Sequence, residues 1–155
     1  MKENSTVKEQ SLNPQSSVRP APQPATEVVL DERVYAALHA ASEKKAIEPV
    51  VLDLRDIASF TDYFAIVSGQ NERQVQAIAD EIYEQLKKTG SAAARVEGYK
   101  TAEWILLDYG DFVVHVFEQK ARKFYDLERL WRESKRVELP AEFLDESTRS
   151  LRTES

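Results

Sequence analysis

Apolar residues recur at helical spacing in two stretches of the chain. After Asp31, a residue suited to cap a helix N-terminus, apolar side chains repeat at helical intervals from Val34 onwards, which predicts a helix that ends near Ala46. Asn71 is a second N-cap candidate, and Gly90 marks the end of the helix that follows it. The apolar stripe of this second helix consists of Val75, Ile78, Ala79, Ile82 and Leu86.

Extended segments separate these helices. Pro49 cannot continue the first helix, and the β-branched run at residues 50–55 is typical of a strand with one apolar face. Residues 63–67 are apolar on both faces of an extended chain. This pattern predicts a central strand that helices cover on both sides.

The second half of the domain begins with strands and ends with a helix. Residues 104–108 and 112–117 flank a tight turn at 109–111, which predicts a β-hairpin, and residues 95–97 form a short edge strand beside it. A third amphipathic helix is expected after Ala121. Its predicted apolar stripe is Phe124, Leu127, Leu130 and Trp131.

The predicted order of elements is α-β-β-α-β-β-β-α, which indicates an α/β domain with a mixed sheet of about five strands and helices packed on it. Residues 1–27 hold four of the six prolines and no aromatic side chain, so we expect a disordered tail. Residues 28–132 form the folded domain. Residues 133–155 carry ten charged side chains and are expected to be a mobile tail, with a short helix after Pro140.

Composition narrows the possible functions. The absence of Cys excludes disulfides, thiolate nucleophiles and Cys-rich metal sites, and His39 and His115 are the only imidazoles. No apolar run approaches the roughly 18 residues of a membrane-spanning helix, so we expect a cytoplasmic protein without a membrane partner. The net charge of -6 argues against a protein that holds DNA or RNA on its own surface, and it favours a basic partner.

The hairpin carries the densest group of polar candidates. Glu103, Asp108, Asp111 and His115 lie close together in sequence, and a His115–carboxylate pair could perform acid–base chemistry in a transferase or hydrolase. The structural alternative, which we favour, is that His115 is a half-buried imidazole satisfied by a neighbouring carboxylate and that Asp108 and Asp111 shape the turn. Trp104 begins its strand next to a loop, where a large aromatic side chain can serve as an exposed anchor for a partner.

Two further motifs fail as catalytic sites. Ser68-Gly69-Gln70 lies between a strand and a helix but has one glycine and no following Lys-Ser or Lys-Thr, so it predicts a tight turn and no phosphate cradle. Asp53 and Asp56 are three residues apart at a strand end and do not make the alternating carboxylate pair of a two-metal transferase. We therefore expect no metal, no cofactor and no catalysis.

Longer motifs resemble a known family. The segments 103–111 (EWILLDYGD), 114–117 (VHVF) and 124–131 (FYDLERLW), the last preceded by Arg122, are similar to the signature of the Iojap-like ribosomal silencing factors. The resemblance covers residues 31–132 and departs from the usual family pattern at Glu48-Pro49 and Gln70-Asn71. In the first half it rests on residues 51–54, 62–64, 68–69 and 73–79.

The resemblance implies a binding protein. Family members have a fold similar to nucleotidyltransferases without their catalytic carboxylates. They bind ribosomal protein number fourteen of the large subunit, block the joining of the two subunits and repress translation when nutrients are scarce. The residues expected to bind the partner are Glu103, Trp104, Asp108, Asp111, His115 and Tyr125.

Two other uses of the surface stay open. The chain could act as a scaffold that self-associates or recruits a second protein through its tails. The edge strand and an exposed aromatic side chain would also suit a homodimer.

Overall fold

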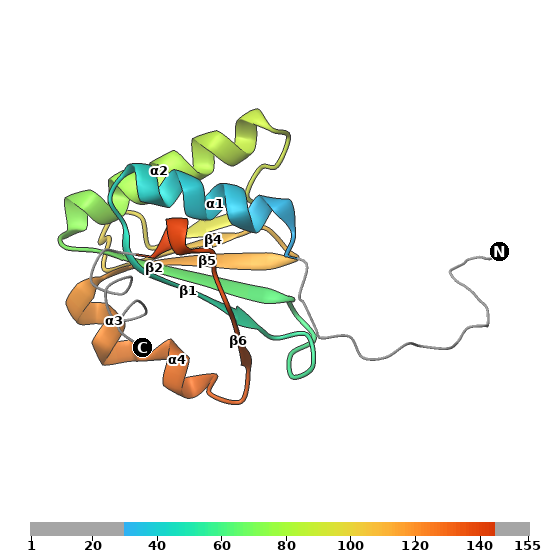
Figure 1. Ribbon diagram of the computed structural model, residues 1–155. Coiled ribbons are helices and arrows are strands. Elements are labelled where there is room, and N and C mark those ends of the chain that lie inside the picture. The colour runs from blue at the N-terminus through green and yellow to red at the C-terminus, as the bar shows by residue number, and fades with distance from the viewer. Residues whose placement is uncertain (1–29, 145–155) are drawn as a thin grey trace, which may run out of the picture.

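The computed structural model describes residues 30–144 as a mixed six-stranded sheet with helices on both faces (Figure 1). Residues 1–29 and 145–155, and with them the predicted tail at 1–27, lie outside the described part. The strands are β1 (Ile47–Asp53), β2 (Tyr63–Gly69), β3 (Arg95–Glu97), β4 (Trp104–Asp108), β5 (Phe112–Glu118) and β6 (Lys135–Val137). The helices are α1 (Glu32–Glu43), α2 (Glu72–Lys88), α3 (Gln119–Tyr125) and α4 (Leu127–Leu130), followed by the 3-10 helix η2 (Ala141–Phe143).

The strands lie in the order β3-β4-β5-β2-β1-β6. The central pair, β2 and β5, is parallel, and the other neighbours are antiparallel, so the predicted mixed sheet is confirmed with six strands rather than about five. The predicted hairpin is β4–β5, and the predicted edge strand is β3.

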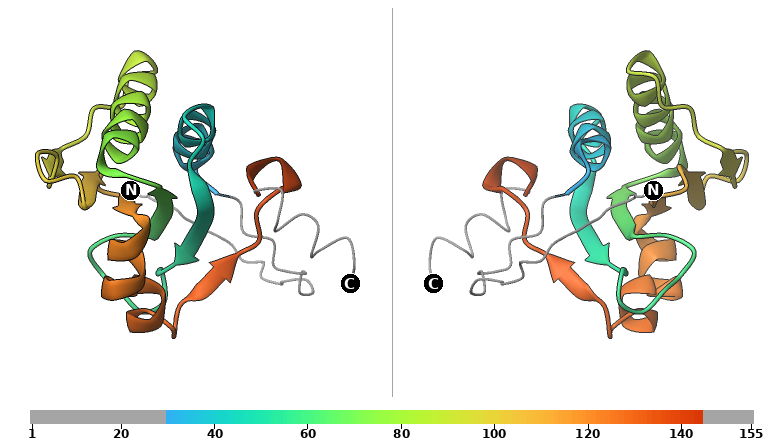
Figure 2. Two further views of the ribbon diagram at one scale, coloured as in Figure 1. Left: turned by 90° about the vertical axis from the view of Figure 1, so that its left-hand side faces the viewer. Right: turned by 90° about the vertical axis from the view of Figure 1, so that its right-hand side faces the viewer.

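Helices cover the two faces of the sheet as separate layers. Helices α1 and α2 lie on one face with η2 beside α1, and α3 and α4 lie on the other face (Figure 2). Every residue of β2 is buried, as expected for a strand between two layers. The first core lies under α1 and α2 and includes Val34, Ile78 and Ile105. The second core lies under α3 and α4 and includes Leu54 and Phe117.

Both predicted helix starts are confirmed by their capping hydrogen bonds. The Asp31 carboxylate accepts from the backbone N–H of Arg33, and the Asn71 side chain accepts from the N–H of Gln74 at 2.8 Å. Helix α1 ends at Glu43, slightly earlier than predicted.

Strand β1 begins earlier than predicted and contains an irregularity. Its pairing with β2 shifts register between Ile47 and Val50, where Glu48 has a φ of 55° and Pro49 offers no N–H. The helix-breaking effect of Pro49 was predicted, but its place inside a strand was not. A proline is tolerated at this irregularity because the residue there is left out of the regular pairing and needs no N–H to donate.

The structure extends the fold beyond the predicted boundary at residue 132. Strand β6 pairs with the end of β1, and the predicted short helix after Pro140 is η2. Val137, Leu139 and Phe143 are buried, and the ring of Phe143 lies 4.9 Å from that of His39 on α1. The expectation of a mobile segment is therefore wrong for residues 133–144, because these few apolar side chains find a place in the first core.

The third helix also differs from its prediction. The chain breaks at Asp126, which has a left-handed φ of 49°, and forms the two short helices α3 and α4. Of the predicted stripe Leu127 is buried, whereas Phe124 is 79% and Leu130 is 70% exposed. The break ends the helical period, so positions on either side of it no longer share one face.

Candidate interaction site

Trp104 is held against the second core by its neighbours on the hairpin. It lies opposite Phe117 in the β4–β5 ladder, and their rings stack at 4.9 Å between centroids. The indole N–H donates to Nδ1 of His115 at 3.0 Å. Trp104 is thus partly buried, and the expected exposed anchor is also a structural residue.

His115 is a neutral core side chain. It is 3% exposed, its ring lies 4.4 Å from that of Phe64, and burial lowers its pKa to about 3. Because Nδ1 accepts from Trp104, the proton of the neutral ring lies on Nε2, which has no hydrogen-bond partner among the described residues. The role of His115 in partner binding stays a prediction, and with 3% of its surface exposed the side chain would act through its hydrogen bond with Trp104.

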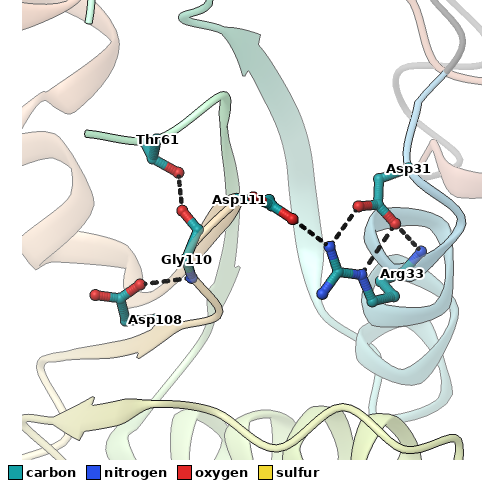
Figure 3. A network of polar contacts seen from close by, with 6 residues as sticks. All are labelled: Asp31, Arg33, Thr61, Asp108, Gly110 and Asp111. Atoms are coloured by element: carbon teal, nitrogen blue, oxygen red, sulfur yellow. Dashed lines mark hydrogen bonds and ion pairs between the residues drawn. The ribbon is translucent and has the colours of Figure 1, made fainter. Parts of the chain in front are cut away.

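The two aspartates of the hairpin bind other groups and not His115. Asp108 accepts from the N–H of Gly110 at 2.9 Å and forms an ion pair with Arg95 at 3.2 Å. Asp111 forms an ion pair at 2.9 Å with Arg33 at the start of α1 (Figure 3). The favoured interpretation, in which Asp108 and Asp111 shape the turn, is therefore confirmed, and the acid–base alternative that pairs His115 with either of them is wrong.

Arg33 also joins α1 to this turn. Asp31 accepts from it at 2.6 Å, and this hydrogen bond lowers the pKa of Asp31 (Figure 3). On the other side of the turn, the Thr61 hydroxyl donates to the carbonyl of Gly110 at 2.9 Å. The turn is therefore fastened to both α1 and the loop before β2.

Tyr125 completes an aromatic surface beside Trp104. The two ring centroids are 4.9 Å apart, and Tyr125 is 45% exposed at the end of α3. We call Trp104 and Tyr125 the aromatic patch. Glu103 is exposed next to it, whereas Asp108 lies at the other end of β4, about 13 Å from Trp104 at the usual rise of a strand. The structure thus brings together Trp104 and Tyr125, with Glu103 the residue before Trp104 in the chain, and it separates them from Asp108 and Asp111.

The loop before β4 sets the position of Trp104. Gly98 has a φ of +80°, and a Cβ at this position would lie 2.1 Å from the carbonyl oxygen of Trp104. The loop is closed by a hydrogen bond from the N–H of Ala102 to the carbonyl of Gly98. Gln76 of α2 ties it down by donating to the carbonyl of Tyr99. The sequence alone gives Gly98 no role, and only the close backbone approach reveals one.

A buried arginine positions the helix that carries Tyr125. Arg122 of α3 donates to the carbonyl of Glu48 at 2.6 Å and to the Ser68 hydroxyl at 2.9 Å, and it forms an ion pair with Glu128 at 2.8 Å. Burial raises the pKa of Glu128, but the hydrogen bond and charge of Arg122 outweigh this and lower it. From the sequence, Arg122 belongs to the family motif, but it was not predicted to join α3 to Glu48, Ser68 and Glu128. The available signal was an arginine among the apolar residues of a helix face.

The remaining candidate motifs form no ligand site in the described part. Gly69 packs so closely on Val75 that an added Cβ would lie 3.1 Å from it, as in the predicted tight turn. The position of Asp53 at a strand end predicts a solvated acid, but this prediction is wrong, because Asp53 is buried and paired with Arg55 at 2.9 Å. Within residues 30–144, no three His, Asp or Glu side chains gather to hold a metal ion, and no helix is long and apolar enough to cross a membrane.

Comparisons with known proteins agree on one family. The family model described as ribosomal silencing factor during starvation matches residues 28–155. The ribosomal silencing factor RsfS of Halalkalibacterium halodurans is 43% identical over 108 residues, which cover 70% of this chain and 92% of that protein. A crystal structure of a Bacillus halodurans protein is similar with a TM-score of 0.63 and 42% identity, covering 70% of this chain and 98% of that one.

A more distant relative carries a name that mentions the large ribosomal subunit. A mouse protein called mitochondrial assembly of ribosomal large subunit protein 1 is 29% identical over 92 residues, or 57% of this chain and 40% of that protein.

Proposed function

The chain belongs to the ribosomal silencing factor family, and from this premise we propose how it silences: it binds the large ribosomal subunit through ribosomal protein number fourteen. In this position it blocks joining of the small and large subunits and represses translation under nutrient limitation. The action is steric and needs no catalysis, and it takes place in the cytoplasm. The name of the mouse relative, which refers to the large subunit, supports this choice of subunit.

The observation that carries the proposal is the aromatic patch. Trp104 and Tyr125 form a continuous surface that is partly open to solvent and rests on Phe117, so little ordering is needed when a partner covers it. Large aromatic side chains held rigidly in this way are typical centres of protein–protein interfaces. The buried His115 supports the patch from below by accepting from the indole N–H.

Of the predicted acidic group, Glu103 is the member nearest to the patch along the chain. Its exposed carboxylate directly precedes Trp104 in sequence, and it can pair with a lysine or arginine of a basic ribosomal protein at the edge of the contact. Asp108 and Asp111 keep their ion pairs with Arg95 and Arg33, so we assign them to the fold of the hairpin.

Cosedimentation with separated large and small ribosomal subunits tests the proposal. We expect the protein to pellet with the large subunit alone and to reduce the formation of joined ribosomes. Tyr125→Ala should weaken binding by tenfold or more, because truncation of a central aromatic residue costs roughly 2 kcal/mol or more. Tyr83→Ala is the matched control, since Tyr83 is a partly exposed tyrosine on α2, on the opposite face of the sheet.

The same experiment distinguishes the alternatives. Equal binding by Tyr125→Ala and Tyr83→Ala would refute the patch, and binding to both subunits alike would refute subunit selection. Saturable binding of a nucleoside triphosphate with magnesium would instead support an enzyme of the transferase type. Self-association in the absence of ribosomes would support the scaffold hypothesis or a homodimer, provided that a variant which loses self-association also loses the block on subunit joining.

A further inference from the structure

The charge of the protein is distributed unevenly between its two helical layers. The whole chain has a net charge of -6, yet residues 119–136, which span α3, α4 and the start of β6, contain seven basic and three acidic side chains. The opposite layer, residues 31–45 and 72–88, contains six basic and seven acidic side chains. One face of an acidic protein is therefore locally cationic, which the total charge conceals.

The cations of this face point outward. Lys120, Lys123 and Phe124 follow one another at helical spacing on α3 and are all exposed. Arg122 is the exception, because it is buried and paired with Glu128. Beyond the break at Asp126, the exposed cations continue along the chain at Arg129 and Arg132.

Exposed apolar side chains lie among these cations. The ring of Phe124, 79% exposed, meets that of Tyr125 edge to face at 5.0 Å, and Leu130 is 70% exposed. An exposed aromatic ring beside two lysines matches what single-stranded nucleic acid binds, because bases stack on the ring while cations contact the phosphates. We call Lys120, Lys123, Phe124, Arg129 and Arg132 the basic ridge.

Other occupants fit the ridge less well. A membrane surface would require a longer amphipathic helix, whereas α3 has seven residues and α4 has four. An acidic protein would satisfy the cations but gives no reason for the exposed ring of Phe124. RNA satisfies both, and through Tyr125 the ridge is continuous with the aromatic patch, so one ribosomal surface can meet the two together.

We propose that the basic ridge binds an unpaired segment of large-subunit RNA next to the ribosomal protein that covers the aromatic patch. This inference rests on the proposed function for the identity of the RNA, but the ridge itself should bind RNA without a ribosome. The protein would thus use two kinds of contact, one with protein and one with RNA. Because both contacts lie on one rigid surface, binding of the RNA would strengthen binding of the ribosomal protein.

Fluorescence anisotropy with a labelled oligouridine RNA and the full chain tests the ridge alone. Affinity should fall as salt rises from roughly 50 to 200 mM, with a slope of log K against log salt near -0.7 for each phosphate contacted. The double variant Lys120→Glu/Lys123→Glu should weaken RNA binding at least tenfold and flatten that slope. Phe124→Ala should weaken binding about fivefold or more through lost stacking.

The matched control is Lys87→Glu/Lys88→Glu on α2, which changes the net charge equally on the opposite face. Equal losses in the two double variants would overturn the proposal, because binding would then follow total charge. So would an absence of RNA binding at low salt, or binding to phosphatidylserine vesicles in its place. Tyr125→Ala separates the two functions: it should lose cosedimentation with the large subunit while it keeps most of its affinity for oligouridine.

Discussion

The hydrogen bond between Trp104 and His115 predicts a coupling that mutagenesis can measure. Trp104→Phe keeps an aromatic ring on Phe117 but removes the indole N–H, which leaves Nδ1 of the buried His115 without a donor. His115→Phe removes the acceptor instead. The double variant removes both polar groups, so neither is left unsatisfied in the core.

The magnitudes follow from burial. An orphaned acceptor on a side chain that is 3% exposed should lower the free energy of unfolding by roughly 1 to 3 kcal/mol in Trp104→Phe. His115→Phe should lose less, about 1 kcal/mol, because Trp104 is only partly buried and its N–H can reach water. The double variant should then be more stable than the sum of the two losses predicts, by about 1 to 2 kcal/mol.

Urea unfolding monitored by far-ultraviolet circular dichroism gives all four free energies. The control cycle pairs His115→Phe with Trp131→Phe, because Trp131 lies in the same second core against Phe64 and has no hydrogen bond to His115. Its coupling energy should stay below about 0.5 kcal/mol. If the Trp104 cycle gave no larger coupling than the Trp131 cycle, the bond would contribute nothing specific and the reasoning would be refuted.

Two further predictions concern stability. Folding lowers the pKa of His115 below its ordinary value of about 6.5. As the pH falls below that value, the unfolded chain therefore takes up a proton that the folded chain does not, and the free energy of unfolding should drop by about 2 kcal/mol between about pH 7 and pH 5. His115→Asn, which keeps an acceptor but cannot titrate, should flatten this dependence in urea titrations; an unchanged slope would contradict it. Gly98→Ala should be at least about 1 kcal/mol more destabilising than Gly110→Ala in thermal melts, because both glycines have positive φ but only Gly98 faces the Trp104 carbonyl. Equal losses would mean that the close approach is unimportant.

Local patterns in the sequence predicted those parts of the fold that local interactions decide. Helix α2 follows from a capped stripe of apolar residues, and the β4–β5 hairpin follows from two extended runs around a short turn. In both cases the residues that stabilise each other are near neighbours in the chain. Periodicity and turn chemistry therefore report directly on the structure.

Long-range partners could not be predicted in this way. Asp111 looked free to pair with His115, but it binds Arg33, 78 residues earlier in the chain. Strand β6 has three residues in a charged segment, and only its pairing with β1 makes it a strand. The break at Asp126 was hidden because the apolar spacing around it also suits one continuous helix.

Within the candidate site, aromatic residues were easier to predict than charged ones. Tyr125 does lie against Trp104, although its neighbour Phe124, predicted as part of the apolar stripe, is exposed. The partners of a carboxylate depend on which arginine the fold brings near. The contact between Trp104 and Tyr125 depends mainly on the place of Trp104 in the β4–β5 hairpin and of Tyr125 in the helix that follows it.

The parallel pairing of β2 with β5 has a consequence for how the chain folds. The partners Tyr63 and Phe112 are 49 positions apart, so this central ladder closes a long loop, whereas the β4–β5 hairpin closes a short one. We expect the hairpin and α2 to form early and the central ladder to form in the rate-limiting step. Until then the chain exposes the edge of its most apolar strand, so the interval before β2 and β5 meet is when the protein is most prone to aggregate.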